Sequence, residues 1–157
     1  MCIRDRPVTP GFLIAVLLWK DFEARVRESN PEQKPGLMYD LAIDTLAVQQ
    51  QHIAVPRRYS TFAREVWQLQ PRLAERQARN VKRLLGHKRF RAAFDFLSLR
   101  GADDDKLREC ADWWQSIQEV DSHEQQRMIE ALPKGRGRRR RRRRKRSGER
   151  TASPADG

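Results

Sequence analysis

The chain has 157 residues and a mass of 18.5 kDa, enough for one ordinary domain with an appended tail and too little for a multidomain protein. Its 33 Lys and Arg outnumber its 21 Asp and Glu, and residues 134–157 hold 12 of the basic and 2 of the acidic residues, so attraction to polyanions is expected mainly at that end. The sequence has 8 Gly, 8 Pro and 38% apolar residues, a composition that excludes the collagen, mucin and fully disordered classes. Its two cysteines, Cys2 and Cys110, are far apart and indicate neither a disulfide framework nor a zinc site. This favours a reduced cytoplasmic compartment.

The first part of the chain predicts two helices after an unplaced start. Residues 1–9 have no helical periodicity and are interpreted as a truncated or artefactual gene start. The longest apolar stretch, residues 12–19, is far shorter than the roughly 20 residues of a membrane-spanning helix, so it predicts a buried helix and no membrane span. The predicted core stripe of this helix is Leu13, Val16, Leu17 and Phe22; that of the second is Leu37, Leu41, Ile43, Leu46 and Ala47.

A third helix is predicted from Ser60, which can cap its N-terminus, with the core stripe Phe62, Val66, Leu69 and Leu73. Pro71 lacks the amide hydrogen that a helix interior needs. We therefore expect a kink at Pro71, with the helix continuing to Leu85.

Three more helices complete the predicted order. The first is central and buried, through Phe90, Ala93, Phe94 and Leu97. The second follows the acidic residues 103–105 with the stripe Leu107, Cys110, Trp114 and Ile117, and the last is short, with Met128, Ile129 and Leu132. Strand-like alternation is absent, so the sequence predicts an all-α fold: a compact bundle of five to six helices over residues 10–132, then a disordered arginine-rich tail over residues 133–157.

Four arginines form the clearest functional pattern outside the tail: Arg72, Arg76, Arg79 and Arg83. On one continuous helix they would lie within an arc of about 60°, opposite the apolar residues. Like charges at this spacing cost a helix about 0.2–0.5 kcal/mol per pair, which favours an external polyanion facing them. Taken alone, the stripe is explained equally well as a solvated face on which Glu75 reduces the repulsion among the arginines. The basic tail favours the interpretation that the stripe binds nucleic acid.

The predicted RNA-binding residues are therefore the cations around this stripe and those of the tail, acting mainly through phosphates. They are Arg57, Arg58, Arg64, Arg72, Arg76, Arg79, Lys82, Arg83, Lys88, Arg89, Arg138, Arg139, Arg140, Arg141, Arg142, Arg143, Arg144, Lys145 and Arg146.

Other candidate residues favour structural roles. Arg91 can pair with Asp95 one turn later, and the tryptophans 113 and 114 favour core packing over base stacking. Asp103 and Asp105 have the D-x-D spacing of magnesium ligands but precede a helix, where capping explains them better. The three histidines, His52, His87 and His123, have no metal or general-base spacing, so no catalytic or metal-binding residue is predicted.

Several ordered motifs resemble the C-terminal half of bacterial poly(A) polymerases over about residues 10–146. They are Ile53-Ala54-Val55-Pro56-Arg57-Arg58, Arg64-Glu65-Val66-Trp67-Gln68-Leu69-Gln70 with Arg72-Leu73, Phe90-Arg91-Ala92-Ala93-Phe94-Asp95-Phe96-Leu97, Trp113-Trp114 and the arginine-rich end. The resemblance implies the RNA-binding body and tail of an enzyme that uses ATP and magnesium to add AMP to RNA 3′ ends, promoting RNA processing and decay. It also implies single-stranded RNA 3′ ends, and RNA-decay proteins, as partners.

The resemblance places the catalytic motifs in an N-terminal head that no position of this sequence matches. The chain alone is therefore predicted to be inactive and to hold no cofactor. Two alternatives stay open: the body of a CCA-adding tRNA nucleotidyltransferase, against which the arginine tail argues, and a free-standing RNA-binding or ribosome-associated module. The genomic sequence upstream of residue 10 would separate them.

Overall fold

The computed structural model describes residues 8–29 and 36–133, and within these ranges it contains eight α-helices and no strand. The predicted all-α class is confirmed. The helices are α1 (Pro10–Leu17), α2 (Trp19–Ser29), α3 (Leu37–Gln50), α4 (Arg57–Glu75), α5 (Ala78–Leu85), α6 (Phe90–Arg100), α7 (Asp105–Glu119) and α8 (Ser122–Glu130).

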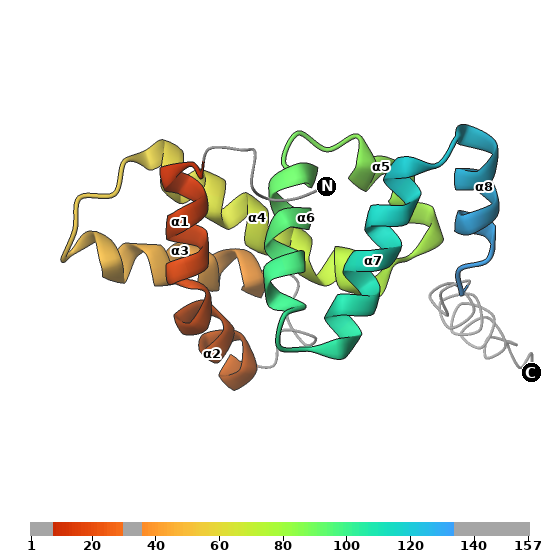
Figure 1. The fold of residues 1–157 in the computed structure, drawn as a ribbon. Coiled ribbons are helices and arrows are strands. Elements are labelled where there is room, and N and C mark those ends of the chain that lie inside the picture. Colours follow the sequence, from red (N-terminus) through yellow and green to blue (C-terminus); the bar gives the residue numbers. More distant parts are fainter. Residues whose placement is uncertain (1–7, 30–35, 134–157) are drawn as a thin grey trace, which may run out of the picture.

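Helix α4 is the central element of the fold. It contacts α1 and α3 toward one end of the molecule and α6 and α7 toward the other, as Figure 1 shows. Its inner face is fully buried at Val66, Trp67 and Leu73, and the largest side chains packed around it include Phe22 and Trp114. One continuous core therefore joins the first helices to the last, with α4 exposing its opposite face.

The first predicted helix is two helices, separated at Leu18. The indole Nε1 of Trp67 donates a hydrogen bond over 3.0 Å to the carbonyl oxygen of Ala15, in the last turn of α1, and its ring stacks on Phe22 with centroids 4.7 Å apart. Carbonyl groups in the last turn of a helix lack partners within the helix. The buried tryptophan thus satisfies the helix end that this break creates.

The core stripe predicted for the first helix is wrong in its α1 part. Leu13, Val16 and Leu17 are exposed, Leu17 by 74%, whereas Gly11 and Ala15 face the core. A Cβ atom added at Gly11 would lie 3.1 Å from the Phe62 ring, so only a very small residue allows α1 to approach α4 this closely. Among the described residues, no helix is both long and apolar enough to cross a bilayer.

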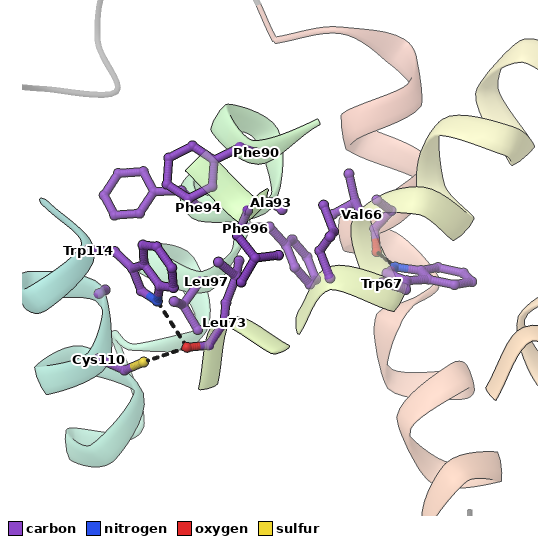
Figure 2. Close-up of a cluster of buried hydrophobic side chains, with 14 of the residues drawn as sticks. Val66, Trp67, Leu73, Phe90, Ala93, Phe94, Phe96, Leu97, Cys110 and Trp114 are labelled. Carbon is purple, nitrogen blue, oxygen red and sulfur yellow. Dashed lines mark hydrogen bonds between the residues drawn. The ribbon is translucent and has the colours of Figure 1, made fainter. Parts of the chain in front are cut away.

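The third predicted helix is also two helices, and its expected continuation to Leu85 is wrong. Helix α4 includes Pro71 and ends at Glu75; Arg76 then adopts a left-handed conformation with φ of 46°, and α5 begins at Ala78. The carbonyl oxygen of Leu73, in the last turn of α4, accepts hydrogen bonds from Trp114 Nε1 at 2.9 Å and Cys110 Sγ at 3.1 Å (Figure 2). These two breaks turn the six predicted helical segments into eight.

The last three helices agree with the sequence prediction. Phe90, Ala93, Phe94 and Leu97 of α6 are buried, as are Cys110, Trp114 and Ile117 of α7. Helices α7 and α8 each begin with an aspartate cap: Asp104 Oδ1 accepts from the amides of residues 106 and 107, and Asp121 Oδ1 from those of residues 123 and 124. The preference for core packing at Trp114 is confirmed.

Candidate nucleic-acid interface

The outer face of α4 carries a row of arginines. At about 100° per residue, Arg57, Arg64 and Arg72 lie within an arc of about 80°. The buried residues Val66 and Leu73 lie on the opposite side of the helix. The first turn contains two arginines and no acidic residue, which is electrostatically unfavourable at a helix N-terminus. The row therefore gives α4 a basic outer face along most of its length.

Helix α5 carries three further exposed cations, Arg79, Lys82 and Arg83, while Val81 and Leu84 are buried. We refer to the arginine row of α4 and these cations together as the basic surface. The partners of the two arginines are neutral amides. Arg79 Nε donates to Gln77 Oε1 over 3.0 Å, and Arg83 Nη2 donates to Asn80 Oδ1 over 3.2 Å. These bonds orient the guanidinium groups and leave their charge uncompensated.

The four-arginine stripe predicted for one continuous helix is divided by the break after Glu75. Arg76, at the break, turns toward α7: its Nη2 lies 3.4 Å from Glu109 Oε1, its guanidinium lies 6.0 Å from the Trp113 ring centroid, and its side chain is only 26% exposed. Arg72 belongs to α4, whereas Arg79 and Arg83 belong to α5. The basic surface therefore spans two helices, and Arg76 is its one member at the helix junction.

Lys88 and Arg89 both pair with Glu65. Lys88 Nζ lies 2.9 Å from Glu65 Oε1, Arg89 Nε lies 2.6 Å from Oε2, and the Arg89 guanidinium covers the Phe62 ring at 4.7 Å. Burial acts to raise the pKa of Glu65, but the hydrogen bonds and charges of Arg89 and Lys88 outweigh it, and the pKa lies below its ordinary value. The single negative charge of Glu65 thus compensates part of the charge of these two cations, and an RNA phosphate would compete with Glu65 for them.

Two other predicted residues lie against tyrosine rings. The Arg58 guanidinium is 4.7 Å from the Tyr59 ring centroid, and its Nη2 donates to the Tyr59 hydroxyl over 2.9 Å. The Arg64 guanidinium is 4.9 Å from the ring centroid of Tyr39, on α3. Sequence reasoning did not single out Tyr39, because nothing in its local sequence indicates that α3 packs it beside Arg64.

Arg91 has the structural role that the sequence predicts. Arg91 Nε lies 3.2 Å from Asp95 Oδ1 within α6. The cap of α7 is Asp104, the residue between the two D-x-D aspartates, whereas Asp105 pairs with Arg108 at 3.0 Å in the first turn and Asp103 is exposed in the preceding turn. The capping predicted for Asp103 and Asp105 is therefore performed by their neighbour. In the described ranges, no group of three or more His, Cys, Asp or Glu side chains is placed to hold a metal ion. The predicted tail residues 138–146 lie outside the described residues.

Comparison with known proteins matches most of the chain to one family and to several curated relatives. Residues 33–147 match the family described as polymerase A arginine-rich C-terminus. The chain is 35% identical over 136 residues to poly(A) polymerase I of Salmonella typhi and 34% identical over 136 residues to that of Escherichia coli O157:H7. It is 30% identical over 129 residues to poly(A) polymerase I of Haemophilus influenzae.

The matched regions are a large part of this chain and a small part of each relative. They cover 82% of this chain for the Salmonella and Escherichia proteins and 78% for the Haemophilus protein. The chain spans only 28–29% of the length of these relatives. The similarity therefore concerns a region that includes α3 to α8 and the arginine-rich end, and it leaves most of each relative unmatched.

Proposed function

Since the chain belongs to the family of polymerase A arginine-rich C-termini, we propose that it is the RNA-binding part of a bacterial poly(A) polymerase. In this proposal the parent enzyme adds AMP from ATP to RNA 3′ ends with magnesium, in the cytoplasm. This chain contributes contacts to single-stranded RNA and no catalytic group. Proteins of RNA decay are partners of the parent enzyme in the same proposal.

One observation carries the proposal. In the part of the chain that the structure describes, no carboxylate pairs with any of six cations on α4 and α5: Arg57, Arg64, Arg72, Arg79, Lys82 and Arg83. Over residues 57–91 the sequence has 11 basic residues and only two acidic ones. Such a concentration of uncompensated positive charge attracts polyanions, and a nucleic-acid strand, with one negative charge on each phosphate, is a polyanion of this kind.

In this proposal each segment of the chain has its own role. Residues 10–132 form the RNA-binding body, residues 133–157 form a basic tail, and residues 1–9 are not assigned a role. The body contributes the cations of residues 57–89, and the tail contributes residues 138–146. Cations without base-reading geometry bind phosphates in any sequence, so this part of the binding is sequence-tolerant.

A charge-removal experiment on the full chain tests the proposal. The interface variant carries Arg72→Gln, Arg79→Gln, Lys82→Gln and Arg83→Gln, all at exposed positions. The matched control carries Lys20→Gln, Arg27→Gln, Lys106→Gln and Arg127→Gln, which are also exposed but lie outside residues 57–91. Both variants lose four charges, so any difference between them reports position and not net charge.

Fluorescence anisotropy with a labelled single-stranded RNA, repeated over a salt series, gives the answer. We expect the interface variant to bind more weakly and to flatten the slope of log affinity against log salt by up to about 3, because each phosphate contact on a single strand contributes about −0.7. The control variant should bind RNA with nearly the affinity and the salt slope of the unmodified chain. Equal losses in both variants, or no RNA binding by the unmodified chain, would reject the proposed interface.

A further inference from the structure

Tyr39 is unusual among the aromatic residues of this chain. The sequence has six Phe, four Trp and two Tyr, all within the described ranges, and of these only Tyr39 is exposed, with 45% of its surface accessible. The others are buried or half-buried in the core and its margins. Tyr39 lies in the first turn of α3, where its neighbours Leu37 and Met38 pack against the core.

The exposed ring lies beside the basic surface. The guanidinium of Arg64, from the arginine row of α4, lies over the Tyr39 ring at 4.9 Å. A flat cation against an aromatic ring makes a favourable contact and keeps both planes in place. Because Tyr39 remains 45% exposed beside this contact, the pair places an accessible aromatic residue next to the cations proposed to bind phosphates.

We propose that Tyr39 and Arg64 form a base-stacking site for single-stranded RNA. This inference rests on the proposed RNA-binding function and adds to it a contact that depends on bases and not on phosphates. Bases of single strands stack on aromatic rings and on arginine planes, and each such contact contributes about 1–3 kcal/mol. Arg64 can bind the strand by its charge while Tyr39 holds a neighbouring base.

Other aromatic residues near the basic surface are less suitable. Tyr59 is half-buried, and Arg58 occupies both its ring face and its hydroxyl group. Trp113 is half-buried and packs edge-on against Trp114 with centroids 5.0 Å apart. Tyr39 therefore combines an accessible ring with a position in the basic surface, and Tyr59 provides a matched control.

The alternative role of the Tyr39–Arg64 pair is to hold α3 against α4. The two roles differ in what removal of the ring does to ligands with and without bases. A structural role predicts equal effects on RNA and on a base-free polyanion, or an effect on unfolding alone. A stacking role predicts a loss that is confined to ligands with bases.

The test measures binding of the full chain to two probes, oligo(A) and inorganic polyphosphate. With Tyr39→Leu we expect affinity for oligo(A) to fall at least about fivefold while affinity for polyphosphate and the salt slope are unchanged, because no charge is removed. Tyr39→Phe keeps the ring and should bind oligo(A) like the unmodified chain, as should Tyr59→Leu. Circular dichroism establishes that each variant is folded, and Tyr39→Gln replaces Tyr39→Leu if the latter unfolds.

The outcomes separate the two proposals. Unchanged oligo(A) affinity in Tyr39→Leu, or an equal loss for oligo(A) and polyphosphate, overturns the stacking site while RNA binding itself stands. Failure of the unmodified chain to bind oligo(A) overturns both the proposed function and this inference.

Discussion

The indole of Trp114 donates its N–H to the carbonyl of Leu73 over 2.9 Å and so joins the middle of α7 to the last turn of α4. Both residues are fully buried. Without the indole, the buried Leu73 carbonyl keeps only the Cys110 thiol, a weak donor at 3.1 Å, and so loses most of the bonding that compensates its desolvation. We therefore expect Trp114→Phe to lower the free energy of unfolding by about 1–3 kcal/mol, measured by urea denaturation.

The control for this prediction is Trp113→Phe, at the neighbouring half-buried position. It removes an indole of the same size without touching the bond to Leu73, and we expect it to cost less. If the two variants lose equal stability, the indole hydrogen bond does not contribute and the cost of Trp114→Phe is packing alone.

The Glu65 pair with Lys88 and Arg89 makes stability depend on pH. Because the folded pKa of Glu65 is lowered, its contribution is fully present above the unfolded carboxyl pKa of about 4.3 and is lost as the pH falls through the folded pKa. At neutral pH the unmodified chain should therefore be more stable than Glu65→Gln, and this difference should shrink on acidification below about pH 4.3. Thermal unfolding over a pH series checks it, with the exposed Glu28→Gln as control; a difference that is constant with pH contradicts the assignment to Glu65.

Glu65→Gln should also strengthen RNA binding, since it releases Lys88 and Arg89 from their carboxylate. The two freed cations can steepen the salt slope by up to about 1.4. Glu23→Gln is the control, because Glu23 also pairs with cations outside the basic surface, namely Lys20, Arg27 and Arg100. Equal gains in the two variants would mean that only net charge matters.

The tail should bind RNA by charge alone. Its residues 138–146 are nine consecutive cations, and engagement of six to nine of them contributes about −4 to −6 to the salt slope. Replacing residues 134–157 by a Gly/Ser segment of equal length should flatten the slope by about that amount and weaken binding to all homopolymers alike. Identical slopes with and without the tail would show that it does not contact RNA.

The chain alone should not add AMP to an RNA primer with ATP and magnesium. Asp104 and Asp105 are engaged at the start of α7, and no described group of acidic side chains fits a magnesium site. Primer extension on denaturing gels tests this. Extension that disappears in an Asp103→Ala, Asp105→Ala variant would contradict it.

The sequence predicted where helices occur better than where they end. Periodic apolar residues located all six helical segments. The breaks within two of these segments lie at Leu18 and Arg76, and neither residue is the glycine or proline by which a helix end is recognised in a sequence. The carbonyls near the two breaks are satisfied by Trp67 and Trp114, which come from distant parts of the chain. Local sequence cannot reveal such partners. It also did not indicate that the close packing of α1 places Gly11 and Ala15, and not Leu13 and Leu17, on the inner face of that helix.

For the candidate site, too, the sequence predicted some features and not others. Counting charges identified the basic region of residues 57–91 and the exposed cations of α5. It could not show that Glu65 pairs with both Lys88 and Arg89, that Arg76 lies beside Glu109 of α7, or that Tyr39 lies beside Arg64. Each of these contacts joins residues that are far apart in the sequence, and only the packing of the bundle brings them together.

The thiol of Cys110 offers a chemical view of the junction between α4 and α7. It is buried, it donates to the Leu73 carbonyl, and burial raises its pKa, so the reactive thiolate is scarce while the junction is closed. Alkylation of Cys110 then requires that the end of α4 separate from α7, and its rate measures how often this happens in the folded ensemble. In a Cys2→Ser background, slower labelling on addition of RNA would mean that the bound strand restrains the opening of a contact on the inner side of the helix whose outer side carries the arginine row.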